Sequence, residues 1–161
     1  IADGVVVLGA VEPADGDAAG VVDDVDYFIA GHLGTAADET GLVACAATGF
    51  LATTKLDVTY RGRAAHAGLA PESGRNALLA AAALVLQLHA LPRHSGGDSR
   101  INVGTLHAGS GRNVIAAEAR LQLEVRGATT EVNEFLASEA RRLAEAVAHG
   151  HGVEAEIAVV G

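Results

Sequence analysis

Two stretches of strict alternation between apolar and polar residues, at 55–60 and 119–126, constrain the fold of this chain more than any other feature. In the second stretch Leu121, Leu123 and Val125 fall on one side and polar residues fall on the other. A period of two residues is typical of a β-strand with one buried face. Both stretches therefore predict strands of a sheet that has one face against a core and one face in water.

Two helices are predicted between the strands. The segment 75–91 consists of strong helix formers and is followed by Pro92, which cannot continue a helix. A second helix is expected with Thr130 as its cap, apolar residues at helical spacing, and Gly150 and Gly152 at its end. Because the first helix is apolar on almost every side, we expect it to pack against a partner or another domain as well as the sheet.

Further strands are expected at 100–109 and 153–160, so the order of elements over residues 50–161 is β-α-β-β-α-β. This order predicts an α+β fold of two layers, a ferredoxin-like four-stranded antiparallel sheet with both helices on one face. Residues 1–49 differ in character, because a strand-like apolar run is followed there by an acidic stretch with glycines. They are interpreted as the edge of a second, α/β domain and a connector.

Composition excludes several classes of function. A formal net charge of −9, spread along the chain, argues against a nucleic-acid surface. Half of the residues are hydrophobic, yet no run free of charge is long enough to span a bilayer, so no membrane partner is expected. The single cysteine, Cys45, cannot form an internal disulfide, and no signal segment opens the sequence. A cytoplasmic location is expected.

Two motifs carry a resemblance to a known family. The segments "YRGRAAHAGLAPESGRNALLAAA" and "INVGTLHAGSGRNVIAAEARLQLEVRG" resemble the dimerisation (lid) domain of the di-metal amidohydrolases and peptidases, which include carboxypeptidase G, aminoacylase and succinyl-diaminopimelate desuccinylase. The resemblance covers roughly residues 26–161, and within the family it is strongest to the A-type p-aminobenzoyl-glutamate hydrolases.

The resemblance implies an activity, a cofactor and a partner. The parent reaction would be metal-dependent hydrolysis of an N-acyl amino acid amide such as p-aminobenzoyl-glutamate, with zinc or manganese as the divalent metal. Residues 50–161 would be the domain through which a homodimer forms. Residues 1–49 would be a remnant of the catalytic domain and a connector.

The resemblance also implies roles for single residues. His66 in "AAHAG" matches a lid histidine that enters the partner's active site and hydrogen-bonds the scissile carbonyl as negative charge develops. Asn113 and Arg126 match lid positions that meet the substrate, and His32 matches a metal ligand. Without the family, His66, Asn113 and His32 would be interpreted as turn or loop residues, and Arg126 as a solvated or ion-paired arginine.

The sequence departs from the family pattern where the metal site should be. Asp15 and Gly16 stand in place of the paired glutamates that serve as general base and ligand, and Ala116 replaces the proline usual after "NVI". We therefore expect that this chain cannot complete a metal site by itself. Two other functions stay open: a non-catalytic dimerisation module, and a ferredoxin-like small-molecule-binding domain that shares the order of elements but leaves "AAHAG" and "GRNVI" unexplained.

Overall fold

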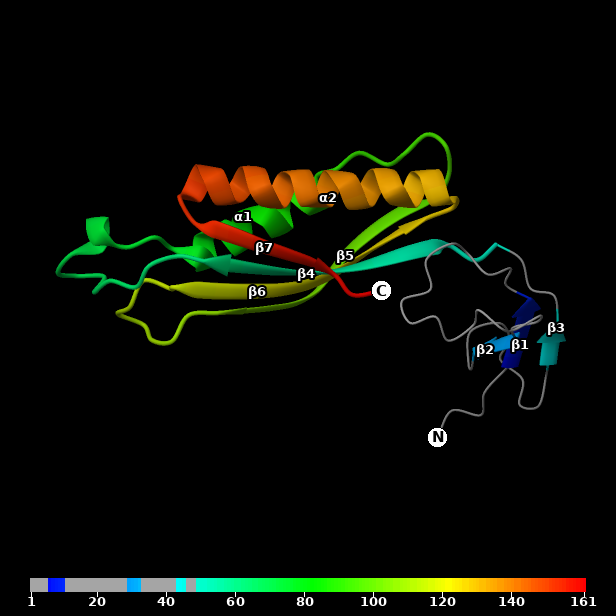
Figure 1. Cartoon of the computed structure of the whole chain (residues 1–161), viewed down its shortest axis with the longest axis horizontal. Helices are drawn as coiled ribbons and strands as arrows, with labels where there is room; N and C mark the ends of the chain where they lie inside the picture. The colour runs from blue at the N-terminus through cyan, green and yellow to red at the C-terminus, as the bar shows by residue number, and fades with distance from the viewer. Residues whose placement is uncertain (1–5, 11–28, 33–42, 46–48) are drawn as a thin grey trace. The chain divides into compact units, whose positions relative to one another are not determined.

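The structure, a computed structural model, describes residues 6–10, 29–32, 43–45 and 49–161 (Figure 1). The chain divides into two compact units, Ile1–Phe50 and Leu51–Gly161. In the first unit, strands β1 (Val6–Ala10), β2 (Ile29–His32) and β3 (Val43–Cys45) form a sheet in the order β2-β1-β3. Strand β1 runs antiparallel to β2 and parallel to β3.

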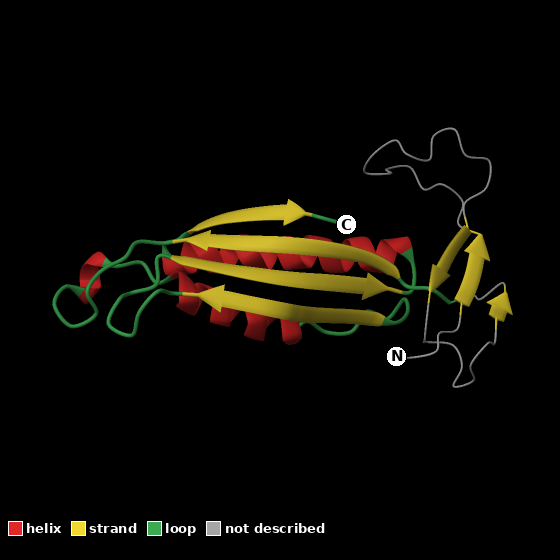
Figure 2. Ribbon diagram, turned by 90° about the horizontal axis from the view of Figure 1, so that it is seen from below, coloured by secondary structure: helices red, strands yellow, loops and turns green. Residues whose placement is uncertain are grey.

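The second unit has the predicted two-layer fold. Its sheet consists of β4 (Ala52–Arg61), β5 (Ser99–Ala108), β6 (Glu118–Gly127) and β7 (Glu154–Val159), in the order β5-β6-β4-β7 with every neighbouring pair antiparallel. The helices α1 (Ala77–His89) and α2 (Thr130–His151) cover one face of this sheet, and the other face is open (Figure 2). The α+β prediction and the β-α-β-β-α-β order are confirmed.

The core lies between the helices and the sheet face that they cover. The alternating strands supply its sheet side, because every second residue is buried along β6 and from Leu56 to Tyr60 in β4. Tyr60 is fully buried there, and its hydroxyl donates a hydrogen bond of 2.9 Å to the carbonyl oxygen of Ala144 in α2. Burial raises the pKa of the Tyr60 phenol well above its usual value, because the phenolate would lose its contact with water.

The helix ends differ from the prediction in detail. The hydroxyl of Thr129, and not that of Thr130, caps α2 by accepting a hydrogen bond of 3.3 Å from the backbone N–H of Val132. Thr129 has the extended backbone that a cap requires, whereas Thr130 is already helical. The helix continues through Gly150 to His151 and is capped by Gly152, whose φ of 63° is in the left-handed region that glycine adopts without strain.

Helix α1 leaves much of its apolar surface uncovered within this unit. Ala80, Leu84 and Leu88 are fully buried, but Leu79 is 53% exposed and Leu86 is 74% exposed. This agrees with the expectation that α1 needs cover beyond the sheet. Neither α1 nor any other helix in the part of the chain that the structure describes combines the length and apolar character of a membrane span.

The register of β4 on β6 gives the sheet two distinct ends. At one end Arg61 pairs with Glu118, and the loops 62–76 and 109–117 lie beyond this pair; we call it the loop end. At the other end Thr53 pairs with Arg126, close to where the chain enters the unit; we call it the connector end. The two pairs are eight positions apart along β6, which is about 26 Å at about 3.3 Å per residue.

Candidate functional site

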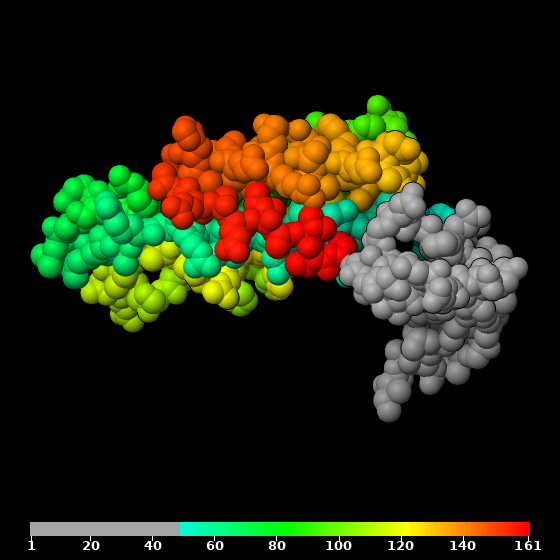
Figure 3. Space-filling model, viewed as in Figure 1, coloured from blue at the N-terminus to red at the C-terminus, as the bar shows by residue number. Residues whose placement is uncertain are grey.

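The loop that carries His66 is held by a second loop. Backbone hydrogen bonds of 2.9 Å run from Ala67 N–H to the Asn113 carbonyl oxygen and from Ile115 N–H to the Ala65 carbonyl oxygen, so His66 lies in a short antiparallel bridge with Val114. The alanines around His66 permit this close approach because they add little bulk. The paired loops protrude from one end of the unit beyond α2 (Figure 3), with His66 exposed.

Gly62 is needed where this loop leaves β4. Arg63 and Arg75 exchange two backbone hydrogen bonds of 2.9 Å, which brings the two arms of the loop together. A Cβ atom at Gly62 would lie 2.1 Å from the carbonyl oxygen of Arg75, and backbone at that distance must move. The close approach of the Arg75 carbonyl therefore requires a glycine at position 62, and this approach holds together the two arms of the loop that carries His66.

The hydrogen bonds of His66 assign its neutral tautomer. The backbone N–H of Gly68 donates to Nδ1 at 3.2 Å, so Nδ1 acts as the acceptor. In a neutral imidazole the other ring nitrogen then carries the proton, and Nε2–H is a donor. This is the form required of a group that stabilises a developing oxyanion.

Asn113 lies beside this donor. Its Nδ2 is 3.5 Å from Nε2 of His66, and both groups are exposed. With Nε2 protonated, the amide nitrogen and the ring nitrogen are both donors that lie side by side. The structure thus brings together two of the predicted site residues, as a pair of donors at the loop end.

Arg126 is not part of this cluster. It lies at the connector end on the open face of the sheet, and its Nε donates to Glu124 Oε1 at 2.8 Å. The length of the sheet separates it from the His66 loop. Its cross-strand neighbour on β5 is Arg100. No motif in the sequence singles out Arg100, because only the strand register reveals that these two arginines are neighbours.

His32 belongs to the first unit, where its backbone pairs with Val7 across β1 and β2. The two positions that depart from the family pattern, Asp15 and Gly16, lie outside the described residues. Among the residues whose positions are given, no three His, Cys, Asp or Glu side chains come close enough to share a metal ion. A metal site needs three or more protein ligands, so the described residues do not fit one.

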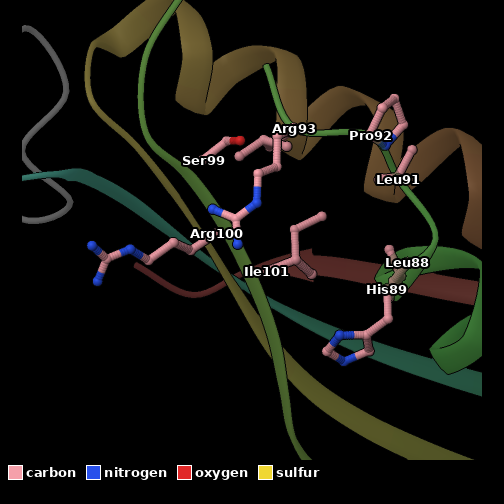
Figure 4. Close-up of a pocket in the computed structure, with 9 residues that line it drawn as sticks. Leu88, His89, Leu91, Pro92, Arg93, Ser99, Arg100 and Ile101 are labelled. Atoms are coloured by element: carbon pink, nitrogen blue, oxygen red, sulfur yellow. The ribbon is translucent and has the colours of Figure 1, made fainter. Parts of the chain in front are cut away.

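Hollows occur at both ends of the sheet. At the loop end, one of about 380 Å³ is lined by Asn76, Leu78, residues 108–111, Val114 and Ala116, next to the bridge that holds His66. At the connector end, one of about 310 Å³ lies between the end of α1 and the start of β5 (Figure 4). Leu88, Leu91, Ile101 and Leu136 supply its apolar wall, and His89, Pro92, Arg93, Ser99 and Arg100 complete it.

The two edges of the sheet differ in character. The β7 edge is six residues long and carries Glu154 and Glu156, and such charges discourage pairing with another strand. The β5 edge is ten residues long, and α1 packs over β5 and β6 beside it. Helix α1, which carries the exposed leucines, therefore lies over the same side of the sheet as the backbone donors and acceptors of β5, and this side of the unit is suited to association with another chain.

Comparison with known proteins agrees with this architecture. The model of a family described as the peptidase dimerisation domain matches residues 52–152. The chain is 50% identical over 143 residues to the A-type p-aminobenzoyl-glutamate hydrolase chain of Escherichia coli K12, and 49% identical over 144 residues to indole-3-acetyl-aspartic acid hydrolase of Enterobacter agglomerans. Each match covers 89% of this chain but 33% of the relative, so the chain spans about a third of the length of these proteins.

A solved structure supports the same relationship. The crystal structure of the aminobenzoyl-glutamate utilization protein from Klebsiella pneumoniae superposes with a TM-score of 0.69 and 47% sequence identity. The superposition covers 70% of this chain and 29% of that one.

Proposed function

The chain belongs to the peptidase dimerisation-domain family, and from this premise we propose that it serves as the lid of a metal-dependent amidohydrolase. The reaction is hydrolysis of the amide bond that joins an acyl group to an amino acid. The curated relatives at about 50% identity are named for p-aminobenzoyl-glutamate and indole-3-acetyl-aspartic acid, both amides of an acidic amino acid. Amides of this kind are the substrates that we assign to the complete enzyme, which we expect to work in the cytoplasm.

The pair of donors formed by His66 and Asn113 is the observation that carries the proposal. Hydrolysis of an amide places negative charge on the carbonyl oxygen, and donors fixed before the reaction stabilise that charge without having to reorganise. Nε2–H of His66 is the donor to this oxygen, and the Asn113 amide supports it. Arg126 binds the carboxylate of the amino acid, because a guanidinium fork matches the two oxygens.

We further propose that His66 acts in the partner's active site, whereas Arg126 acts in its own. The chain enters the domain at the connector end, where Arg126 lies, and the His66 loop is about 26 Å further along the sheet. The exposed leucines of α1 and the β5 edge form the dimer face, so that two sheets join edge to edge about a twofold axis. In such a homodimer the loop end of each lid would reach the active site of the partner, which we call exchange of the loop ends.

Most of the metal's ligands are assigned outside the described residues, which hold no cluster of three by themselves. No step of the reaction is attributed to a metal held by the described residues. We propose His32 as one ligand among several, with the others supplied elsewhere in the enzyme. If this assignment is right, His32→Ala lowers the metal content of the complete enzyme, measured by plasma mass spectrometry after dialysis against zinc or manganese. Unchanged metal content would remove His32 from the ligand set.

The role of His66 is tested in the complete enzyme with p-aminobenzoyl-glutamate as substrate. His66→Ala is expected to lower kcat by about 100- to 1,000-fold, the usual effect of losing one oxyanion donor. His151→Ala is the control, because this histidine is exposed at the end of α2. A loss of only a few fold in the first variant would contradict the oxyanion role.

Mixing two inactive variants tests which protomer His66 serves. A dimer of one His66→Ala chain and one Arg126→Ala chain has one intact site if His66 acts across the dimer, and none if both residues act in the same chain. Random mixing of equal amounts should therefore restore about a quarter of the wild-type activity. Absence of recovery, with mixed dimers verified by mass spectrometry, would refute exchange of the loop ends.

A non-catalytic dimerisation module is the second candidate, favoured by Asp15 and Gly16 in place of the paired glutamates. Such a module keeps the dimer face but has no use for the His66 and Asn113 donors. Wild-type complete enzyme that dimerises, binds metal and still leaves every N-acyl amino acid intact would support this alternative.

A further inference from the structure

Two arginines face each other at the connector end of the open sheet face. Arg100 at the start of β5 and Arg126 near the end of β6 are directly opposed in the register of these strands. Side chains opposed in this way have Cβ atoms about 5 Å apart, and two like charges there destabilise the pair of strands. The chain has 20 acidic residues against 11 basic ones, so two adjacent arginines are not a consequence of composition.

The side chains of both arginines lie on the open face. Residues next to them along the strands, Ile101 and Val125, pair with each other on the helix side, and Val125 is fully buried. Figure 4 shows the Arg100 side chain leaving β5 on the side opposite to Ile101, so it points away from the apolar wall of the hollow. The pair is accessible, because both residues are exposed.

Each arginine is only partly engaged within the chain. Arg100 lies 3.6 Å from Asp98, with both side chains about two-thirds exposed, and such a surface contact contributes little. Arg126 uses Nε and one terminal nitrogen on a single oxygen of Glu124. A guanidinium has five N–H donors, so both arginines keep donors for a ligand, and Glu124 also fixes the orientation of Arg126.

Two adjacent guanidinium groups match a ligand with two carboxylates. In glutamate and aspartate the two carboxylates are separated by a few carbon atoms, a spacing comparable with that of side chains opposed across neighbouring strands. One arginine can then bind each carboxylate with a fork of two hydrogen bonds. Ligand binding also relieves the repulsion that the paired arginines otherwise retain.

We propose that Arg100 binds the side-chain carboxylate of the substrate's amino acid while Arg126 binds its α-carboxylate. Arg100 thereby makes the enzyme selective for amides of acidic amino acids. This assignment rests on the proposed function, in which Arg126 meets the amino acid part of the substrate. It adds a specificity-determining residue that has no part in stabilising the oxyanion.

The test compares two substrates in the complete enzyme, p-aminobenzoyl-glutamate and its neutral isostere p-aminobenzoyl-glutamine. Arg100→Gln is expected to lower kcat/KM for the glutamate amide by about 10- to 100-fold, mainly through KM, because one charged hydrogen-bonded contact is lost. For the glutamine amide the change should stay within about threefold. Arg100→Lys keeps the charge without the fork and should fall between wild type and Arg100→Gln.

Two further variants separate the possible failures. Arg126→Gln should lower kcat/KM for both substrates, because both have the α-carboxylate. Arg120→Gln is the matched control, since Arg120 is on the same face of β6 and is ion-paired with Glu118 at the loop end. Equal losses for both substrates in Arg100→Gln, or no loss in either, would overturn the role of Arg100 while leaving the proposed function in place. Wild-type enzyme that hydrolyses neither substrate would overturn both.

Discussion

Replacing Leu86 by glutamate should separate the two protomers that the α1 and β5 surface is proposed to hold together. Leu86 is 74% exposed in the single chain, and Leu78 and Leu79 are 39% and 53% exposed. Together they leave the surface of about 1.7 leucine residues in water. At about 1.5–3 kcal/mol for each fully buried leucine, a twofold interface that covers them gains about 5–10 kcal/mol. This offsets a large part of the cost of association, about 4–15 kcal/mol, and pairing of β5 edges supplies more.

The effect of Leu86→Glu follows from the same figures. Its exposed fraction corresponds to about 1–2 kcal/mol of burial in each protomer, which is lost twice in a twofold dimer. A loss of about 2–4 kcal/mol raises the dimer dissociation constant by about 30- to 1,000-fold, before the cost of burying a carboxylate is added. Folding of the single chain should be unaffected, because the Leu86 side chain is not part of the core.

Sedimentation equilibrium over a wide range of protein concentration measures this constant directly. Val159→Glu is the matched control, because Val159 is 54% exposed but lies on β7 at the opposite edge of the sheet. The far-ultraviolet circular dichroism of both variants should match that of the wild type. An unchanged dissociation constant for Leu86→Glu, or an equal rise for Val159→Glu, would refute the assignment of the dimer face.

Three further predictions concern the fold. Tyr60→Phe should lower the free energy of unfolding by about 1 kcal/mol at neutral pH through the lost hydrogen bond to α2. Burial raises the pKa of Tyr60, so the folded state retains a proton that the unfolded chain loses above about pH 10. The free energy of unfolding of the wild type should therefore fall as the pH rises beyond about 10. Denaturant titrations should show a smaller fall for the variant. Gly127→Ala should lower the free energy of unfolding by more than about 2 kcal/mol in the same titrations, because the new Cβ would lie 2.4 Å from a backbone nitrogen of α2. Gly150→Ala, whose Cβ would meet no atom within 4 Å, should instead stabilise α2 by about 0.5–1 kcal/mol. Equal effects of the two substitutions would contradict the packing at Gly127. Thr129→Ala should cost about 1 kcal/mol and Thr130→Ala only a few tenths by thermal unfolding, and the reverse order would show that Thr130 is the cap.

Only part of the candidate site could be predicted from the sequence. The small residues around His66 and the turn residues around Asn113 marked two separate loops, but nothing in the sequence places Nε2 of His66 3.5 Å from the Asn113 amide. That contact depends on backbone pairing between His66 and Val114, which are 48 positions apart in the sequence. Arg100 was missed for a similar reason, since its neighbour Arg126 is known only from the register of β5 on β6.

The types of the elements of the second unit, their order and the buried faces of β4 and β6 could be predicted from the sequence. These properties are local: the period of two residues in β4 and β6 and the propensities in α1 depend on neighbours a few positions away. Three other properties emerge only in the folded domain: β5 and β7 form the edges, His66 and Arg126 lie at opposite ends of the sheet, and Arg100 faces Arg126. Strand order and register follow from how the apolar faces of all elements fit one core, which is a property of the whole domain and of no single segment.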